Sequence, residues 1–238
     1  MRDLQQVWVY LSASPLLHLT MTLVAYQFSS FVYRRGRLSP LLNPVLLSLV
    51  LIVVILSATG TTYDTYFDGA QFVHFLLGPA TVALAIPLFR QLDRVRRSAV
   101  AVIASIAVGS VAASFSAVAI AWLLDGSRQT LVSLAPKSVT APVAMGIAEQ
   151  LGGLPSLTAV LVISTGILGA IAGPYVLNFL GIKDQAARGL AMGTASHGIG
   201  TARAMQVSEV AGAFAGLAMG LNALATAVLL PLIWKIFW

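Results

Sequence analysis

The residues of this chain that are best suited to chemistry lie in one apolar stretch, Gly189–Met205, which reads GLAMGTASHGIGTARAM. The stretch has the hydropathy of a membrane segment, yet it contains the imidazole of His197 and the guanidinium of Arg203. Gly198 and Gly200 weaken a helix and expose backbone polar groups, which lipid tolerates only beside protein or a water-filled cavity. The composition therefore predicts a weak helix that holds something polar.

In a regular helix, four residues of this stretch recur at every fourth position and are predicted to share one face. They are Gly189, Gly193, His197 and Thr201. His197 could bind an anion when protonated, relay a proton, or make only an interhelical hydrogen bond, which is common for polar residues in membrane helices. We favour a role in a binding site because Gly193 and Gly200 leave space beside the imidazole.

Lys137 is the sharpest candidate outside this stretch. An ionisable side chain at membrane depth costs about 2.5–3.5 kcal/mol on insertion scales, so it is a functional hypothesis by default. Lys137 follows Pro136 and precedes Ser138 and Thr140, a composition typical of a broken helix whose backbone and hydroxyls help to bind a carboxylate. A lysine that extends to the outer membrane surface is the alternative.

Three further polar residues each have two interpretations. Arg203 is placed near the cytoplasmic end of its span, where it either binds substrate or extends to the lipid headgroups. Glu149 either carries protons, or pairs with a basic residue, or is solvated at the inner surface. Asn43, directly before Pro44, is predicted to begin a helix, although a buried amide is also a good ligand.

The composition sets the class of the protein. Only 9% of the 238 residues are charged and 58% are hydrophobic, whereas soluble domains carry about 25% charged residues. We therefore predict an all-α, polytopic helical membrane protein that forms a single integral membrane domain over residues 1–238. There is no cysteine, and neither a metal site nor a cofactor has support. No catalytic constellation is present in the sequence, so an enzyme is not expected.

A membrane span needs about 20 apolar residues, and the apolar runs predict seven or eight passes. We place them near 7–32, 40–59, 71–89, 98–124, 130–151, 155–180, 187–206 and 210–236. Seven of the fourteen basic residues form two clusters, at 34–37 and 90–97. Such clusters mark the cytoplasmic side of a membrane, which also argues against a nucleic-acid partner. The connection between them contains Asp64 and Asp68 and is predicted to face outward.

The second half of the chain is predicted to be irregular. Proline and glycine are dense between Pro136 and Pro155, which indicates a discontinuous or re-entrant segment. A shift of 57 positions also places residues 77–86 over 134–143, both with the pattern L-[GA]-P-x-[ST]-V. This predicts an internal repeat, with chance recurrence in a chain rich in Leu, Val and Ala as the alternative. The repeat halves are about 40–125 and 126–238.

Several segments, in the same order, resemble the LrgB/CidB family of bacterial membrane proteins. They are Asn43-Pro44, residues 76–88 (LLGPATVALAIPL), 136–140 (PKSVT), 152–158 (GGLPSLT) and 193–204 (GTASHGIGTARA). The resemblance covers about residues 15–237, and the length and hydropathy also fit. The family is described as antiholin-like, modulating murein hydrolase activity and autolysis with a small LrgA/CidA-type partner. A plastid relative is similar to a glycolate/glycerate translocator, and bacterial relatives are linked to pyruvate uptake.

From the residues and this resemblance together, we expect a secondary transporter of small monocarboxylates in the bacterial cytoplasmic (inner) membrane. The substrate-binding candidates are Asn43, Pro79, Thr81, Lys137, Ser138, Thr140, Gly193, His197, Gly200, Thr201 and Arg203. Glu149 and His197 are the candidates for ion coupling. The expected partners are the lipid bilayer, the carboxylate, an LrgA/CidA-like protein and a second copy of the chain, because homodimers are the commonest assembly.

The alternative is a holin- or antiholin-like regulator of murein hydrolase activity that acts by helix association. The small residues Gly212, Gly216 and Gly220 recur at every fourth position, which is typical of closely packed membrane helices.

Overall fold

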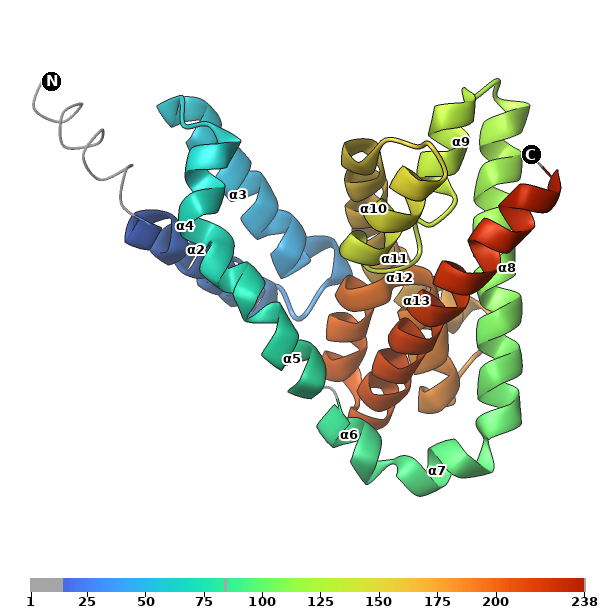
Figure 1. The fold of residues 1–238 in the computed structure, drawn as a ribbon. Coiled ribbons are helices and arrows are strands. Elements are labelled where there is room, and N and C mark those ends of the chain that lie inside the picture. The colour runs from blue at the N-terminus through green and yellow to red at the C-terminus, as the bar shows by residue number, and fades with distance from the viewer. Residues whose placement is uncertain (1–14, 84, 238) are drawn as a thin grey trace, which may run out of the picture. The chain divides into compact units, whose positions relative to one another are not determined.

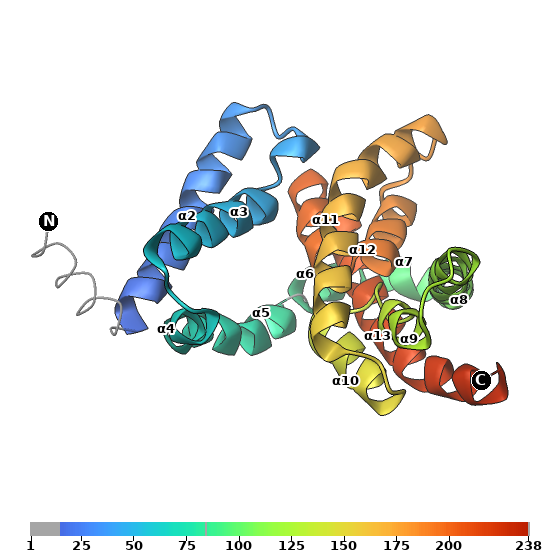
Figure 2. The same ribbon diagram turned by 90° about the horizontal axis from the view of Figure 1, so that it is seen from above.

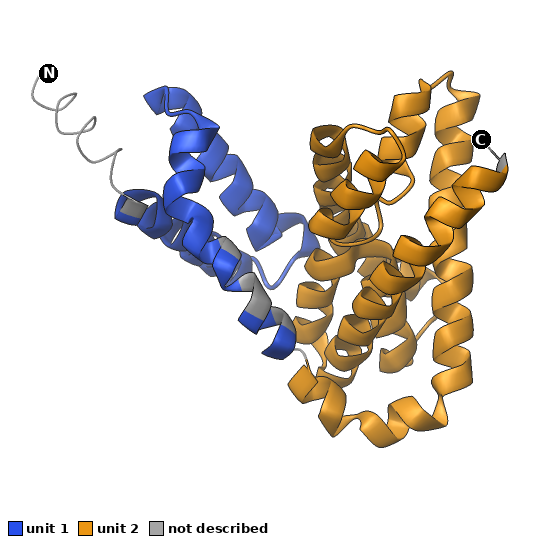
Figure 3. Ribbon diagram, viewed as in Figure 1, with its two compact units in different colours: residues 1–83 blue, residues 84–238 orange. Residues whose placement is uncertain are grey.

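The computed structural model describes residues 15–83 and 85–237, and every regular element within these ranges is a helix. The chain divides into two compact units, residues 1–83 and 84–238 (Figure 3). Each unit is described by itself. The all-helical prediction is confirmed for the described residues.

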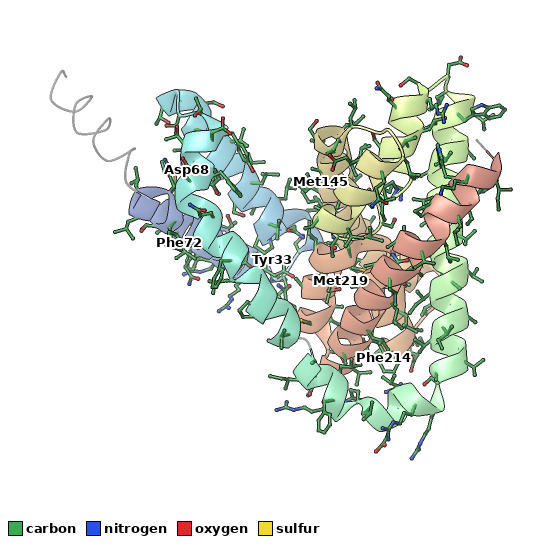
Figure 4. The ribbon with its side chains drawn as sticks, viewed as in Figure 1. Tyr33, Asp68, Phe72, Met145, Phe214 and Met219 are labelled. Atoms are coloured by element: carbon green, nitrogen blue, oxygen red, sulfur yellow. The ribbon has the colours of Figure 1, made fainter. Side chains whose placement is uncertain are left out.

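The described part of unit 1, residues 15–83, contains two long helices, a shorter pair and a short 3₁₀ helix. They are α2 (Pro15–Arg35), η1 (Pro40–Leu42), α3 (Pro44–Thr59), α4 (Tyr63–Phe75) and α5 (Leu77–Ala83). Helix α2 packs against α3 and α4, and His18 on α2 is buried with its ring edge-on to Tyr66 of α4. Asp64 and Asp68, predicted in a connection, lie on α4; Figure 4 marks Asp68.

Unit 2 contains the remaining helices. They are α6 (Ala85–Arg90), α7 (Leu92–Arg97), α8 (Ala99–Leu123), α9 (Arg128–Leu134), α10 (Ala141–Gln150), α11 (Pro155–Phe179), α12 (Gln185–Val207) and α13 (Glu209–Phe237). Helix α13 contacts α6, α8, α10 and α12, so it is central to the unit. In Figure 1 the short helices α6 and α7 lie at the lower end of unit 2, and α9 and α10 lie at the upper end.

Four helices within the described residues are long and apolar enough to cross a membrane. They are Pro40–Thr59, Ala99–Leu123, Pro155–Phe179 and Glu209–Ile236. Three predicted spans, 98–124, 155–180 and 210–236, agree with α8, α11 and α13 within a residue or so. The total of seven or eight passes stays a prediction.

The predicted span 130–151 is not one helix. Its residues form α9 and α10, which contain 7 and 10 residues and are separated by the turn Ala135–Thr140. At 1.5 Å per residue these helices are about 10 and 15 Å long, too short to cross a hydrocarbon core of about 30 Å. They contact each other and lie side by side at one end of unit 2 (Figures 1 and 2). We call them the first hairpin, with residues 135–140 as its tip.

Helix α12 is also broken, and this corrects the prediction of one continuous face. Ser196 (φ −129°, ψ 15°) and His197 (φ 41°, ψ −130°) leave helical geometry and divide α12 into two halves. Gly193 and Thr201 therefore lie on different halves and do not stack along one helix. The glycines at 198 and 200 do not mark the break itself, which falls one residue before them.

The two halves of α12 fold back on each other. A Cβ atom on Gly200 would lie only 2.5 Å from the carbonyl oxygen of Met192, although eight residues of straight helix would separate them by about 12 Å. Both ends of α12 also lie near one cluster of arginines: Asp184, before its start, pairs with Arg94 at 2.8 Å, and Glu209, after its end, pairs with Arg90 at 3.3 Å. We call residues 185–207 the second hairpin, with Ser196–His197 as its tip.

Packing against α13 holds the second hairpin in place. Phe214 is fully buried with Val102 and Ile106 of α8 and Ala186 of α12 (Figure 4). Glycine in α12 allows the backbones to approach so closely that a Cβ on Gly189 would overlap the carbonyl of Ala211. This is the close packing that small residues spaced by four predict.

Candidate functional site

One side chain of α13, Asn222, connects the tip of the first hairpin to the residues directly before the tip of the second. Its amide Nδ2 donates one hydrogen bond to the carbonyl of Ser138 and one to the carbonyl of Thr194, both at 3.1 Å. Ser138 belongs to the tip of the first hairpin, and Thr194 lies two residues before the break in α12. Asn222 is only 1% exposed. A buried polar side chain therefore connects two segments of irregular backbone in the interior of unit 2.

A residue of α11 makes a second connection between the tips. Nε2 of His197 donates a hydrogen bond of 2.9 Å to the carbonyl of Val162. The side chain of Val162 is fully buried and packs with Val139 in the tip of the first hairpin. One residue thus contacts the first tip through its side chain and the second through its backbone.

The positive charge of Lys137 lies in the first tip. Its ammonium donates to the hydroxyl of Ser138 at 3.1 Å. Lys137 is partly buried and Ser138 is buried. The first tip therefore holds an ammonium group and a hydroxyl beside each other.

Each tip also contains the N-terminus of a helix. Helix α10 begins directly after Thr140, whose side chain makes no capping hydrogen bond, and the second half of α12 begins after His197. The first N–H groups of a helix have no intrahelical partner, and the helix dipole favours negative charge at this end. The tips thus combine a lysine with two helix N-termini, which is a suitable environment for an anion.

The backbone of His197 is strained. A positive φ of 41° is uncommon for a residue with a side chain, and such conformations cost about 1–3 kcal/mol. Two glycines of α11 accommodate the break: a Cβ on Gly166 would lie 2.6 Å from Cε1 of His197, and one on Gly169 would overlap Oγ of Ser196. The surrounding structure therefore holds the imidazole in a costly conformation.

Thr201 stabilises the second tip. Its hydroxyl donates to the carbonyl of His197 at 2.7 Å and is 3.4 Å from the carbonyl of Ala215. Gly193 and Gly200 have packing roles, because a Cβ on Gly193 would overlap the carbonyl of Ala215 and one on Gly200 would crowd Met192. The sequence predicted that Gly193 and Gly200 leave space beside His197. In the structure, Gly166 of α11 provides that space.

Two charged candidates do not lie at the tips. Glu149 is exposed in the last turn of α10, nine residues from Thr140 and so about 13 Å along that helix. Arg203 lies six residues beyond His197, about 9 Å along its helix, and lines a small cavity of about 30 Å³ with Gln185, Arg188 and Met192.

The remaining candidates belong to unit 1. The side-chain oxygen of Asn43 accepts from the backbone N–H groups of Val45 and Leu46, at 2.8 and 3.2 Å. The prediction that Asn43 begins a helix is thus confirmed. Pro79 is exposed on α5, and the side chain of Thr81 lies outside the described residues.

Sequence reasoning missed Asn222, Val162 and Gly166. Asn222 carried a signal, because an amide in the middle of an otherwise apolar span is expensive and marks function or packing. Val162 carried no such signal, because the contact is made by its backbone carbonyl, a group that every residue has. Gly166 stood out only under the 57-residue shift, which places Gly109 over it.

The comparisons with known proteins place the chain in a family. The model of the LrgB-like family matches residues 22–236. The chain belongs to the LrgB-like family. A Staphylococcus epidermidis protein named holin-like protein CidB is 32% identical over 229 residues, which is 96% of this chain and 99% of that protein. The Bacillus subtilis protein YwbG, named as uncharacterized, is 36% identical over 91% of this chain and 96% of its own length. No solved structure matches.

Membership of the LrgB-like family confirms the resemblance drawn from the sequence motifs. The same name, holin-like protein CidB, is given to a Staphylococcus aureus relative that is 32% identical over 94% of this chain. Together with the apolar helices, these relatives identify the chain as a bacterial-type membrane protein of this family.

Proposed function

We propose that this LrgB-family protein is a secondary transporter of small monocarboxylates, with its binding site at the tips of the two hairpins. The observation that carries the proposal is the double hydrogen bond of Asn222, which joins the two tips beside Lys137. Irregular backbone at membrane depth is tolerated where it is covered by protein or lines a cavity, and broken helices are typical of transporter binding sites.

The chemistry of the tips favours an anion. The ammonium of Lys137 and the N-terminus of α10, which starts after Thr140, belong to the first tip. The second tip contributes His197 and the N-terminus of the second half of α12. A carboxylate between them would accept from the ammonium, from Ser138 and from backbone N–H groups. These few groups are enough to bind one carboxylate, so the site suits a small acid.

We further propose that unit 2 contains the predicted internal repeat and that its two copies are inverted. Helices α8, α9 and α10 begin at residues 99, 128 and 141. Adding 57 to these numbers gives 156, 185 and 198. Helix α11 begins at residue 155, α12 begins at 185, and the second half of α12 begins directly after His197. The first hairpin follows the upper end of α8 in Figure 1, and the second hairpin returns to the arginines of α6 and α7.

Two hairpins that enter from opposite ends give a physical route to alternating access. Movement of the first hairpin would open the tips toward one side of the membrane, and movement of the second would open them toward the other. The helices α8, α11 and α13 would stay fixed, because each is long enough to span. The proposed coupling ion is the proton, with His197 or Glu149 as its carrier.

We further assign the protein to the bacterial cytoplasmic membrane, as a multi-pass homodimer that works with an LrgA/CidA-like partner. The arginines at residues 90–97 favour a cytoplasmic position for the end of unit 2 that contains α6 and α7.

The test is uptake of labelled glycolate and pyruvate into proteoliposomes that contain the purified chain, with and without a pH gradient. Saturable uptake that rises with the gradient supports the proposal. Uptake that equals that of empty liposomes, and stays there when an LrgA-like protein is added, overturns it.

A regulatory function is the second candidate, because relatives are named holin-like proteins. In that case the chain would act by associating with a partner helix, and Gly216→Leu should abolish its effect in a lysis assay while His197→Ala should not. The Gly212 end of this small-residue stripe is already used within the chain, since a Cβ there would meet the side chain of Met205 at 2.6 Å.

A further inference from the structure

Asn222 has one atom whose hydrogen-bonding capacity is not used. Both hydrogens of Nδ2 are donated, to the carbonyls of Ser138 and Thr194. The reverse orientation of the amide would place an oxygen against two carbonyl oxygens, so the orientation is fixed. Oδ1 is buried and makes no hydrogen bond within the described residues. A buried acceptor without a donor is costly, and at the meeting point of two hairpin tips it requires an explanation.

We infer that Oδ1 of Asn222 accepts a hydrogen bond from the hydroxyl group of a bound hydroxycarboxylate, so that Asn222 determines specificity. The inference rests on the proposed transport function and assigns a residue and a substrate class to the same site. The carboxylate would face Lys137 and the helix N-termini, and the 2-hydroxyl would face Asn222.

The charges around the tips narrow the choice of donor. An ammonium group could also donate to Oδ1, but it would lie near the ammonium of Lys137, because Lys137 and Asn222 both hydrogen-bond to Ser138. Like charges in a poorly solvated site repel strongly. A neutral hydroxyl gives the same hydrogen bond without this repulsion. The site therefore favours hydroxy acids over amino acids, and over acids that lack a donor.

Three acids of similar size separate these cases: glycolate, acetate and glycine. In wild-type proteoliposomes we expect the apparent KM for acetate to be at least about tenfold that for glycolate, because a buried polar group is unpaired when acetate binds. Glycine should not compete. In Asn222→Ala the ratio of the two KM values should fall to about one, mainly through loss of glycolate affinity.

Thr226 supplies the matched control. It lies one helical turn beyond Asn222 and shares a buried hydrogen bond of 2.9 Å with Ser110. Thr226→Ala should lower stability and leave the KM ratio unchanged. If Asn222→Ala does not fold, Asn222→Leu is used, because leucine keeps a similar shape and has no acceptor at the position of Oδ1.

The outcomes distinguish this inference from the proposed function. Equal KM values for glycolate and acetate in the wild type overturn the inference and leave a carboxylate transporter. A ratio that is unchanged in a folded Asn222 variant, or competition by glycine as strong as by glycolate, also overturns it. Failure of the wild type to take up any of these acids overturns the proposed function instead.

Discussion

His197 reaches across from the break in α12 and donates through Nε2 to the carbonyl of Val162 on α11, at 2.9 Å. The bond explains why a histidine is held at a φ of 41°, where glycine would be less strained. The side chain needs this position to contact α11, and Gly166 leaves room for the ring. The strained backbone of His197 is therefore what allows its side chain to contact α11.

Replacing His197 by glycine should separate strain from function. His197→Gly relieves the backbone strain, whereas His197→Ala keeps most of it, so the glycine variant should be more stable than the alanine variant by about 1 kcal/mol. Both should lose saturable uptake. Thermal unfolding in detergent gives the stability order. An alanine variant as stable as the glycine variant would contradict a strained break.

Gly166→Ala should destabilise unit 2 through a contact with His197. The new Cβ would lie 2.6 Å from Cε1 of the ring, and overpacking of this kind costs about 1–3 kcal/mol. Combined with His197→Gly, which removes the ring and leaves only the 2.9 Å approach to the flexible Cδ1 of Ile199, the substitution should cost less, so the two effects are not additive. The control is Gly146→Ala in α10, where no atom lies within 4 Å of the new Cβ. That variant should be neutral or slightly stabilised.

The ion pair of Arg90 with Glu209 should contribute little to stability or uptake. The two side chains are 66% and 52% exposed, and exposed pairs are worth about 0–1 kcal/mol. Arg90→Gln should therefore change the unfolding temperature by a few degrees at most and the KM for glycolate by less than about twofold. A loss of uptake as large as that in His197→Gly would place the site at this end of unit 2 and not at the tips.

The sequence predicted the long helices well and the fold-back of α12 not at all. Helices α8, α11 and α13 follow uninterrupted apolar runs, for which length and hydropathy are sufficient. In α12 the four-residue spacing of Gly189, Gly193 and His197 continues through the break, so periodicity predicts a straight helix. Packing against Gly166 and Gly169, which are distant in sequence, decides otherwise.

The same limit applies to the site. Lys137 and Ser138 were predicted from their neighbours, because a lysine beside proline and hydroxyl residues is unusual in an apolar run. Asn222 was overlooked, although a lone amide in a span was a usable signal. The two N–H donors of Asn222 reach Ser138 and Thr194 only because three segments of the chain meet in space. The spacing of residues along the sequence does not predict that meeting.

Chemical replacement of the charge at position 137 tests the central claim most directly. The chain contains no cysteine, so Lys137→Cys provides a single reactive thiol. This variant should take up no glycolate, because the ammonium in the first tip is missing. Modification with 2-aminoethyl methanethiosulfonate restores an ammonium on a stem of similar length, and modification with methyl methanethiosulfonate adds a neutral group of smaller size.

Glycolate uptake by the Lys137→Cys protein should return after the aminoethyl reagent and not after the methyl reagent, with the extent of labelling confirmed by mass. That result would identify a positive charge at the hairpin tip as the group that binds the carboxylate. Full uptake by the unmodified variant, or equal recovery with both reagents, would contradict a carboxylate site at the tips.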